Sequence, residues 1–400
     1  MSNGLDALGP LAARVPDQLR ASAGYHVPRP ANIRAKLDAN ELPFPLPEEL
    51  RQRLGAALAE VSLERYPDPN AAELRSVLAQ RLGIAPSQLV FGNGSDELIA
   101  MIVAAFAAPR GAGQTSAEQA PERGIGPARA ELARPAAVLF PSPTFVYYRL
   151  AAIARGIESI EVPLTSRFEL DEVAIERAIE QHEPSVVFLA LPNNPTGTLW
   201  RMEFAVELAA RHRNVAVISD EAYFAYSGRS SLAHLAQHPN LIVMRTLSKV
   251  GMAGLRVGYT ISSPPIAELL ERLRPPYNLS ALDQAAAVFM LREATSWCEA
   301  SAAEVVTERK QLEATLARLP GVEVFPSEAN LLLVRLGLGR ATAIYRALQA
   351  DGLLVRNFDR PDAKLAGPLD GCLRITVGTP AENALLLASL AVHCEAIRNP

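Results

Sequence analysis

Short, unbroken runs of apolar residues recur along most of this chain, and they constrain its fold more than any other feature. These runs cover residues 89–91, 137–140, 186–190, 215–218, 241–244 and 257–261. A strand with one face in water alternates apolar and polar residues, whereas these runs do not alternate, so both faces of each strand are expected to be buried. Helical patterns lie between the runs. The sequence therefore predicts an α/β fold, with a mostly parallel central sheet flanked by helices.

The length of the chain and a change of pattern near residue 285 predict more than one domain. A chain of 400 residues exceeds what one compact core usually holds. Residues 61–284 carry the alternating strands and helices and are predicted to form a large domain. Residues 285–400 contain strands and helices that pair locally, which is typical of a smaller α+β domain. Residues 1–60 are predicted to be an N-terminal arm and a part of this small domain.

Residues 110–135 interrupt the large domain with no apolar period. They are rich in glycine, alanine, proline, serine and glutamate, so they offer no face that could be buried against a core. We predict a surface insertion that is mobile or disordered.

Composition and charge narrow the classes of function. The net charge of -4, with no dense run of lysine or arginine, argues against a nucleic-acid partner. The three cysteines, Cys298, Cys372 and Cys394, are far apart, so neither a disulfide framework nor a metal site is expected. The first thirty residues lack a signal-peptide pattern, and no apolar stretch is long enough for a membrane span. A cytoplasmic location without membrane partners is expected.

Three polar motifs follow predicted buried strands. They are residues 193–197 (Asn-Asn-Pro-Thr-Gly), 220–223 (Asp-Glu-Ala-Tyr) and 246–249 (Thr-Leu-Ser-Lys). Taken singly, each has an ordinary interpretation as a turn, a capped helix start or a solvated lysine. The carboxyl ends of parallel strands, however, meet at the edge where open α/β sheets bind ligands. Together the motifs predict a ligand site at that edge.

Two further segments follow predicted strands. Residues 92–97 (Gly-Asn-Gly-Ser-Asp-Glu) lead into a helix, and glycine together with free amides at a helix start favours an anion. Taken alone, this segment is better interpreted as a glycine turn that caps a helix. Phe145 follows the run 137–140 and is equally suited to stacking on a flat cofactor or to packing in the core.

These motifs, with residues 253–259 (Ala-Gly-Leu-Arg-Val-Gly-Tyr), resemble those of fold-type I pyridoxal-phosphate (PLP) dependent aminotransferases. The strings at residues 37–41, 65–68, 92–97 and 371–379 resemble the histidinol-phosphate aminotransferase subfamily. The resemblance extends over nearly the whole chain outside the arm and the insertion. It implies a homodimeric enzyme of histidine biosynthesis that transfers an amino group between glutamate/2-oxoglutarate and imidazole acetol phosphate/L-histidinol phosphate.

The resemblance also implies a role for each motif residue, with pyridoxal 5'-phosphate as cofactor. Lys249 binds the cofactor covalently and shuttles a proton, while Asp220 pairs with the pyridine nitrogen. Asn194 and Tyr223 donate to the phenolic oxygen, and Phe145 covers the ring. Residues implied near the cofactor phosphate are Gly94, Ser95, Asp96, Ser248, Arg256 and, from the neighbouring subunit, Tyr66. Residues implied to bind the substrate are Arg374, Arg356, Tyr25 and Asn194.

Alternatives of the same fold are an aromatic amino-acid aminotransferase and a decarboxylase of phosphorylated amino acids. A non-enzymatic regulator that senses an amine is a third alternative, but residues 1–35 are too short and too weakly basic for the DNA-binding segment that it would need. The sequence departs from the family in two places. The interval from Lys249 to Arg256 is one residue shorter than in many aminotransferases, and Phe145 stands where several relatives have tyrosine.

Overall fold

The structure, a computed structural model, describes residues 32–107, 136–360 and 367–396, with residues 9–11, 13 and 15 near the amino terminus. The predicted insertion and Tyr25 lie outside the described residues. A seven-stranded sheet has the order β2-β8-β7-β6-β5-β3-β4. Its strands are β2 (Leu89–Asn93), β3 (Ala137–Ser142), β4 (Glu158–Pro163), β5 (Val186–Ala190), β6 (Ala216–Asp220), β7 (Leu241–Thr246) and β8 (Val257–Ile261).

The predicted α/β fold with a mostly parallel sheet is confirmed. One strand, β8, is antiparallel to its neighbours, and the sheet contains one strand, β4, that was not among the predicted ones. Neighbouring strands from β4 to β7 pair in parallel, whereas β8 is antiparallel to both β7 and β2. The sequence analysis did not predict the edge strand β4. Its residues alternate between exposed and buried because one face lies in solvent, so it lacks the unbroken apolar run that marks the inner strands.

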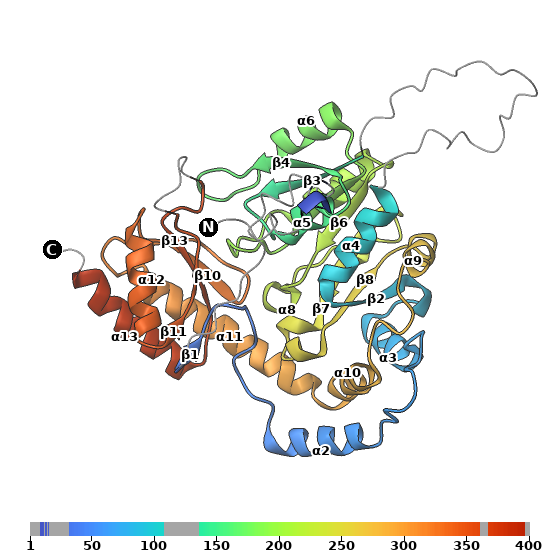
Figure 1. Cartoon of the computed structure of the whole chain (residues 1–400), viewed down its shortest axis with the longest axis horizontal. Helices are drawn as coiled ribbons and strands as arrows, with labels where there is room; N and C mark the ends of the chain where they lie inside the picture. Colours follow the sequence, from blue (N-terminus) through green and yellow to red (C-terminus); the bar gives the residue numbers. More distant parts are fainter. Residues whose placement is uncertain are drawn as a thin grey trace, which may run out of the picture.

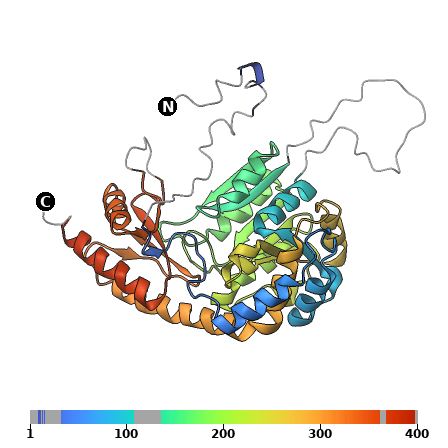
Figure 2. The ribbon, with the colours of Figure 1, turned by 60° about the horizontal axis from the view of Figure 1, so that its bottom comes forward.

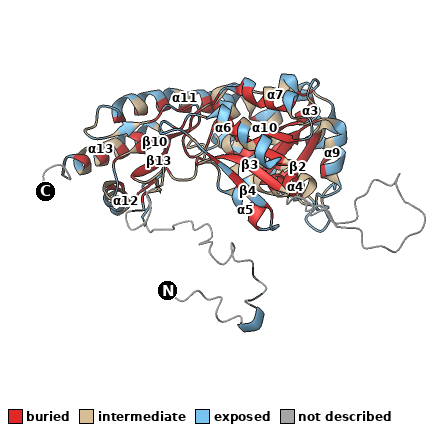
Figure 3. Cartoon of the chain, turned by 90° about the horizontal axis from the view of Figure 1, so that it is seen from above, coloured by how far each residue is buried: buried red, intermediate tan, exposed pale blue. Residues whose placement is uncertain are grey.

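Helices cover both faces of this sheet, as the unbroken apolar runs predicted (Figures 1 and 3). One face packs against a cluster of buried side chains from α3 (Ala72–Leu82), α6 (Glu172–His182), α7 (Met202–Arg211) and α10 (Ala281–Glu293). The other face packs against α4 (Gly94–Phe106), α5 (Tyr147–Ile153) and α9 (Pro264–Glu271). Buried apolar area of this extent is the main stabilising term of the fold.

A second group of elements lies at one end of the molecule (Figure 2). A four-stranded antiparallel sheet has the order β12-β13-β10-β9, and β1 pairs with β11 beside it. The strands are β1 (Ala35–Lys36), β9 (Glu323–Val324), β10 (Leu331–Arg335), β11 (Leu353–Leu354), β12 (Arg356–Asn357) and β13 (Cys372–Thr376). The helices are α11 (Thr295–Leu316), α12 (Arg340–Ala350) and α13 (Pro380–Ala396). The pairing of β1 with β11 brings the N-terminal segment into this group. The domain boundaries after residues 60 and 284 stay predictions.

Two kinds of feature are absent from the described residues. None of the helices in this part of the chain is long and apolar enough to cross a membrane. Over the same residues, no group of three or more His, Cys, Asp or Glu side chains could hold a metal ion.

Candidate active site

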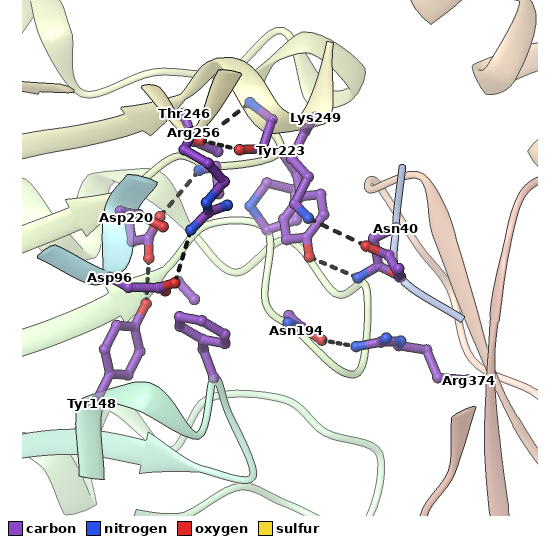
Figure 4. Close-up of a pocket in the computed structure, with 17 residues that line it drawn as sticks. Asn40, Asp96, Tyr148, Asn194, Asp220, Tyr223, Thr246, Lys249, Arg256 and Arg374 are labelled. Carbon is purple, nitrogen blue, oxygen red and sulfur yellow. Dashed lines mark hydrogen bonds and ion pairs between the residues drawn. The ribbon is translucent and has the colours of Figure 1, made fainter. Parts of the chain in front are cut away.

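The ends of six strands meet at one edge of the seven-stranded sheet. Strand β2 runs in the same direction as β7 because β8 is antiparallel to both, so the first residues of β8 lie at that edge too. A cavity of about 190 Å³ opens there (Figure 4). The predicted site residues that line it are Ser95, Asp96, Phe145, Asn194, Asp220, Tyr223, Ser248, Lys249, Arg256 and Arg374. The structure thus brings together motifs that lie up to 279 residues apart (95 to 374).

Three described residues named in the sequence analysis, Gly94, Arg356 and Tyr66, do not line this cavity. Gly94 precedes the lining residue Ser95, Arg356 lines an adjoining pocket, and Tyr25 is outside the described residues. Tyr66 is 81% exposed on another surface of the chain.

Asp220 ends the central strand β6 and is held in a fixed orientation. One carboxylate oxygen accepts a hydrogen bond from the Tyr148 hydroxyl at 2.6 Å, and the other accepts from the Ala222 amide at 3.1 Å. Burial raises the pKa of Asp220 to about 6, and the two hydrogen bonds oppose this rise because they stabilise the anion. A basic group placed against Asp220 would therefore be bound in its protonated form.

Lys249 ends the short turn that follows β7, and its amine points into the cavity. The amine donates to the Ala39 carbonyl at 3.4 Å and lies 5.8 Å from the centre of the Tyr223 ring. Burial, followed by the positive charge of Arg374, lowers the pKa of Lys249 to about 8. An amine with this pKa is partly neutral near physiological pH, which a nucleophile or a proton carrier requires.

One side of the cavity has the character of an anion site. Gly94, with a φ of 75°, begins helix α4, and its amide donates to the Arg256 carbonyl at 2.5 Å. A side chain at Gly94 would collide with the guanidinium of Arg256, so glycine permits this close approach of the guanidinium to the helix start. The guanidinium pairs with Asp96 at 3.1 Å. The start of α4 and a guanidinium are both typical anion binders.

Two arginines form the opposite side. Arg374 on β13 donates to the Asn194 side-chain oxygen at 2.7 Å and to the Asp38 carbonyl at 2.5 Å. Arg356 on β12 lies directly across from Arg374 in the antiparallel pairing. Like charges directly opposite one another are unfavourable, and an anion between them would relieve the repulsion. Asn194, Phe145 and Arg374 line both the first cavity and an adjoining one of about 270 Å³ that contains Arg356.

The residues present fit PLP. This cofactor is a flat ring with a basic nitrogen, a phosphate and an aldehyde that reacts with amines. The cavity offers a buried carboxylate at Asp220, an aromatic side chain at Phe145, an anion site around Arg256 and an amine at Lys249. Glycine at position 94 lets the Arg256 guanidinium lie against the start of α4, which places a cation at the anion side of the cavity.

Two residues of the cavity were missed by the sequence analysis. Tyr148 is fully buried, its ring stacks on Phe188 at 4.5 Å, and its hydroxyl bonds Asp220. Asn40 bonds the Tyr223 hydroxyl at 2.8 Å. Asn40 stood inside one of the strings that carry the family resemblance, but no role was attached to it. Tyr148 had no motif signal, because only the folded chain brings it to Asp220.

Comparisons with known proteins agree with this site. The sequence model of the family "Aminotransferase class I and II" matches residues 33–117 and 123–390. A histidinol-phosphate aminotransferase of Burkholderia lata is 40% identical over 371 residues, which is 92% of this chain and 95% of the relative. One of Paracidovorax citrulli is 39% identical over 394 residues, which is 96% of this chain and 98% of the relative.

Solved structures give the same result. Histidinol-phosphate aminotransferase of Sinorhizobium meliloti, in complex with pyridoxal-5'-phosphate, superimposes with a TM-score of 0.77 at 26% identity, over 92% of each chain. An L-threonine-O-3-phosphate decarboxylase of Porphyromonas gingivalis has a TM-score of 0.72 at 23% identity, over 90% of this chain and 99% of the other, which shows a shared fold alone. The chain belongs to the class I and II aminotransferases, and among them to the histidinol-phosphate aminotransferase family.

Proposed function

We propose that this protein uses PLP to transfer an amino group between glutamate/2-oxoglutarate and imidazole acetol phosphate/L-histidinol phosphate, a step of histidine biosynthesis. The observation that carries the proposal is a pair of adjoining cavities that share Phe145, Asn194 and Arg374. An amine and a buried carboxylate line the first cavity, and two arginines paired across neighbouring strands line the second. The two relatives from Burkholderia lata and Paracidovorax citrulli are named histidinol-phosphate aminotransferases. Their sequence similarity to this chain extends over nearly its whole length.

The cofactor, when bound, supplies an electron-withdrawing ring that stabilises negative charge at the carbon bearing the amino group. Asp220, held by Tyr148 and the Ala222 amide, would place a negative charge against the basic nitrogen of the cofactor. Phe145 would cover the flat ring and help to exclude water. Lys249 would hold the cofactor through its amine, and the same amine would act as the proton carrier, for which its lowered pKa suits it.

The pH dependence of cofactor uptake follows from the pKa of Lys249. Only a neutral amine can attack the aldehyde, so uptake by ligand-free protein is expected to speed up about tenfold per pH unit up to about pH 8 and then to level off. The growth of visible absorbance after mixing with PLP measures this rate. A rate that still climbs tenfold per unit from pH 9 to pH 10 would indicate an ordinary lysine and contradict the assignment of Lys249.

Arg374 and Arg356 explain how one pocket could bind both substrates, glutamate and histidinol phosphate. Glutamate brings two carboxylates, whereas histidinol phosphate brings a phosphate and no carboxylate. A guanidinium can pair bidentately with either group, so Arg374 can serve both half-reactions. Arg356 lies beyond Asn194 in the adjoining cavity, with Phe358 and Leu369 beside it. This wall of apolar side chains offers room for a flat ring next to an anion.

A transamination screen tests the proposed function. Purified protein loaded with PLP is incubated with glutamate and either imidazole acetol phosphate, phenylpyruvate or other oxo acids, and 2-oxoglutarate formation is followed. Imidazole acetol phosphate is expected to give the highest kcat/KM. A preference for phenylpyruvate would identify an aromatic aminotransferase instead. Release of carbon dioxide from a phosphorylated amino acid, without any oxo acceptor, would identify a decarboxylase.

We also propose that the active unit is a homodimer that acts in the cytoplasm. Tyr66 stacks on Tyr277 with ring centres 4.6 Å apart, and Leu63 and Leu282 beside them are exposed. An exposed apolar patch of this kind is typical of an interface. In the family Tyr66 corresponds to a tyrosine that reaches the neighbouring subunit's cofactor phosphate, and here it does not line the cavity of its own chain. The three cysteines are free and buried, which fits a reducing compartment.

Mixing two inactive variants tests the shared site. Tyr66→Phe and Lys249→Ala chains, unfolded together and refolded, are expected to regain about a quarter of the wild-type activity, because half of the dimers are mixed and one site in each is intact. Activity is measured against each variant refolded alone. Full activity of Tyr66→Phe by itself, or of a monomer at the assay concentration, would contradict the proposal.

A further inference from the structure

Asn40 lies in the segment that passes from β1 to the active-site cavity, and it is 2% exposed. Its backbone has a φ of 54°, a left-handed conformation that asparagine and glycine tolerate better than other residues. Its backbone N–H donates to the Thr376 hydroxyl at 3.0 Å, and its backbone carbonyl accepts from the Asn330 side chain at 3.1 Å. Asn40 is thus held by Thr376 at the end of β13 and by Asn330, the residue before β10.

These contacts fix which way the side-chain amide of Asn40 faces. The Thr376 hydroxyl accepts the backbone N–H of Asn40, so its single hydrogen is free to donate to the side-chain oxygen of Asn40, 3.0 Å away. The NH₂ group must then face the Tyr223 hydroxyl at 2.8 Å. In the reverse orientation the NH₂ group would face the Thr376 hydroxyl. The hydroxyl hydrogen of Thr376 would then have no acceptor among these contacts.

The orientation of the amide determines what the Tyr223 hydroxyl can do. An NH₂ group can only donate, so the Tyr223 oxygen accepts from Asn40, and its own hydrogen is directed to its other neighbours. Tyr223 lines the cavity, with the Lys249 amine 5.8 Å from its ring (Figure 4). We propose that Asn40 is a positioning residue that makes Tyr223 a hydrogen-bond donor toward an anionic oxygen of the ligand in the cavity. This inference rests on the proposed function, because that oxygen is the phenolic oxygen of PLP.

Two substitutions of Asn40 distinguish its effect on the direction of the Tyr223 hydrogen bond from its effect on the backbone conformation. Asn40→Asp keeps the size and the left-handed conformation but sets an acceptor against Tyr223, which turns the hydroxyl hydrogen away from the cavity. Asn40→Gly keeps the backbone without strain and removes the amide, so the hydroxyl loses its fixed polarity without any change of charge. Asn32 offers matched controls, because it is also left-handed, with a φ of 60°, but is exposed and outside the cavity.

The experiment is a pH titration of the visible absorbance of bound PLP, combined with steady-state kinetics. A hydrogen bond to the phenolic oxygen stabilises its anion, so losing the bond is expected to raise the midpoint of the titration, by roughly one pH unit for Asn40→Asp and less for Asn40→Gly. We expect kcat to fall about tenfold for Asn40→Asp with little change in the KM for glutamate. Asn32→Asp and Asn32→Gly should titrate as wild type.

A double-mutant cycle with Tyr223→Phe separates this role from a merely structural one. In the Tyr223→Phe background, Asn40→Gly is expected to move the midpoint no further, because the hydroxyl on which it acts is gone. An equal shift in both backgrounds, or no shift in either, would overturn the inference even if the variants melt at lower temperature. Wild-type protein that shows no visible band with PLP would instead overturn the proposed function itself.

Discussion

Lys249→Ala is expected to lose the visible absorbance of lysine-bound PLP and to reduce turnover by about three orders of magnitude or more. Lys249 lines the same cavity as Asp220 and Tyr223, and no other described lysine lines that cavity. Both the covalent attachment and the proton transfer depend on this amine. Absorbance spectra of the purified variant, and its turnover with glutamate and the preferred oxo acid, measure the two losses.

The melting temperature of Lys249→Ala without PLP shows whether this variant is folded. The pKa of Lys249 is about 8 in the folded protein and lies below its usual value of 10.5. The folded state therefore binds this proton less tightly than the unfolded state. As a result, the buried charge of Lys249 lowers the free energy of unfolding at all pH values below about 8. Lys249→Ala should melt at the same or a higher temperature than ligand-free wild type at pH 7.

Lys310→Ala is the matched control, because Lys310 is exposed on α11 and outside the cavity. It should keep both the visible band and the turnover of wild type. A band in Lys249→Ala that borohydride reduces would show that another lysine binds the cofactor, and the assignment would then be wrong.

Arg374→Ala is expected to reduce kcat/KM about a hundredfold in both half-reactions, since a buried guanidinium that pairs with the substrate anion is lost. Arg356→Ala is expected to weaken the phosphorylated substrate more than glutamate, because Arg356 lines only the adjoining cavity. Single-turnover absorbance changes follow each half-reaction separately.

The matched control for the two arginines is Arg346→Ala, which removes the same charge from the exposed face of α12. It should leave both half-reactions unchanged. Equal losses for glutamate and for the phosphorylated substrate in Arg356→Ala would remove the physical basis for the choice of substrate, although the aminotransferase activity would still stand.

The sheet could be predicted from the sequence because its inner strands are buried on both faces and therefore read as unbroken apolar runs. The edge strand β4 could not, since it alternates in burial. The reversed direction of β8 could not either, because strand direction depends on connections and packing that a run of apolar residues does not record.

The same distinction applies to the site. Asp220 is the last residue of β6, and Asn194 and Lys249 lie within four residues of the ends of β5 and β7, so position along the chain was enough to group them at one edge. Tyr148 lies in helix α5, 72 residues before Asp220, and its hydrogen bond depends on how α5 packs on the sheet. The same holds for Asn40, whose partner Thr376 is 336 residues away.

The pairing of β1 with β11, together with the contacts of Asn40, sets the order in which a newly made chain can become active. The segment that carries Asn40 leaves the ribosome early, but Thr376, which orients it, is made 336 residues later. At roughly ten residues per second this interval is about half a minute. For the last 127 residues of that interval (249 to 376), roughly thirteen seconds, Asp220 and Lys249 have been made, but Arg374 and Thr376 have not. The site that lines the cavity is therefore complete only once β13, which carries Arg374, has been made.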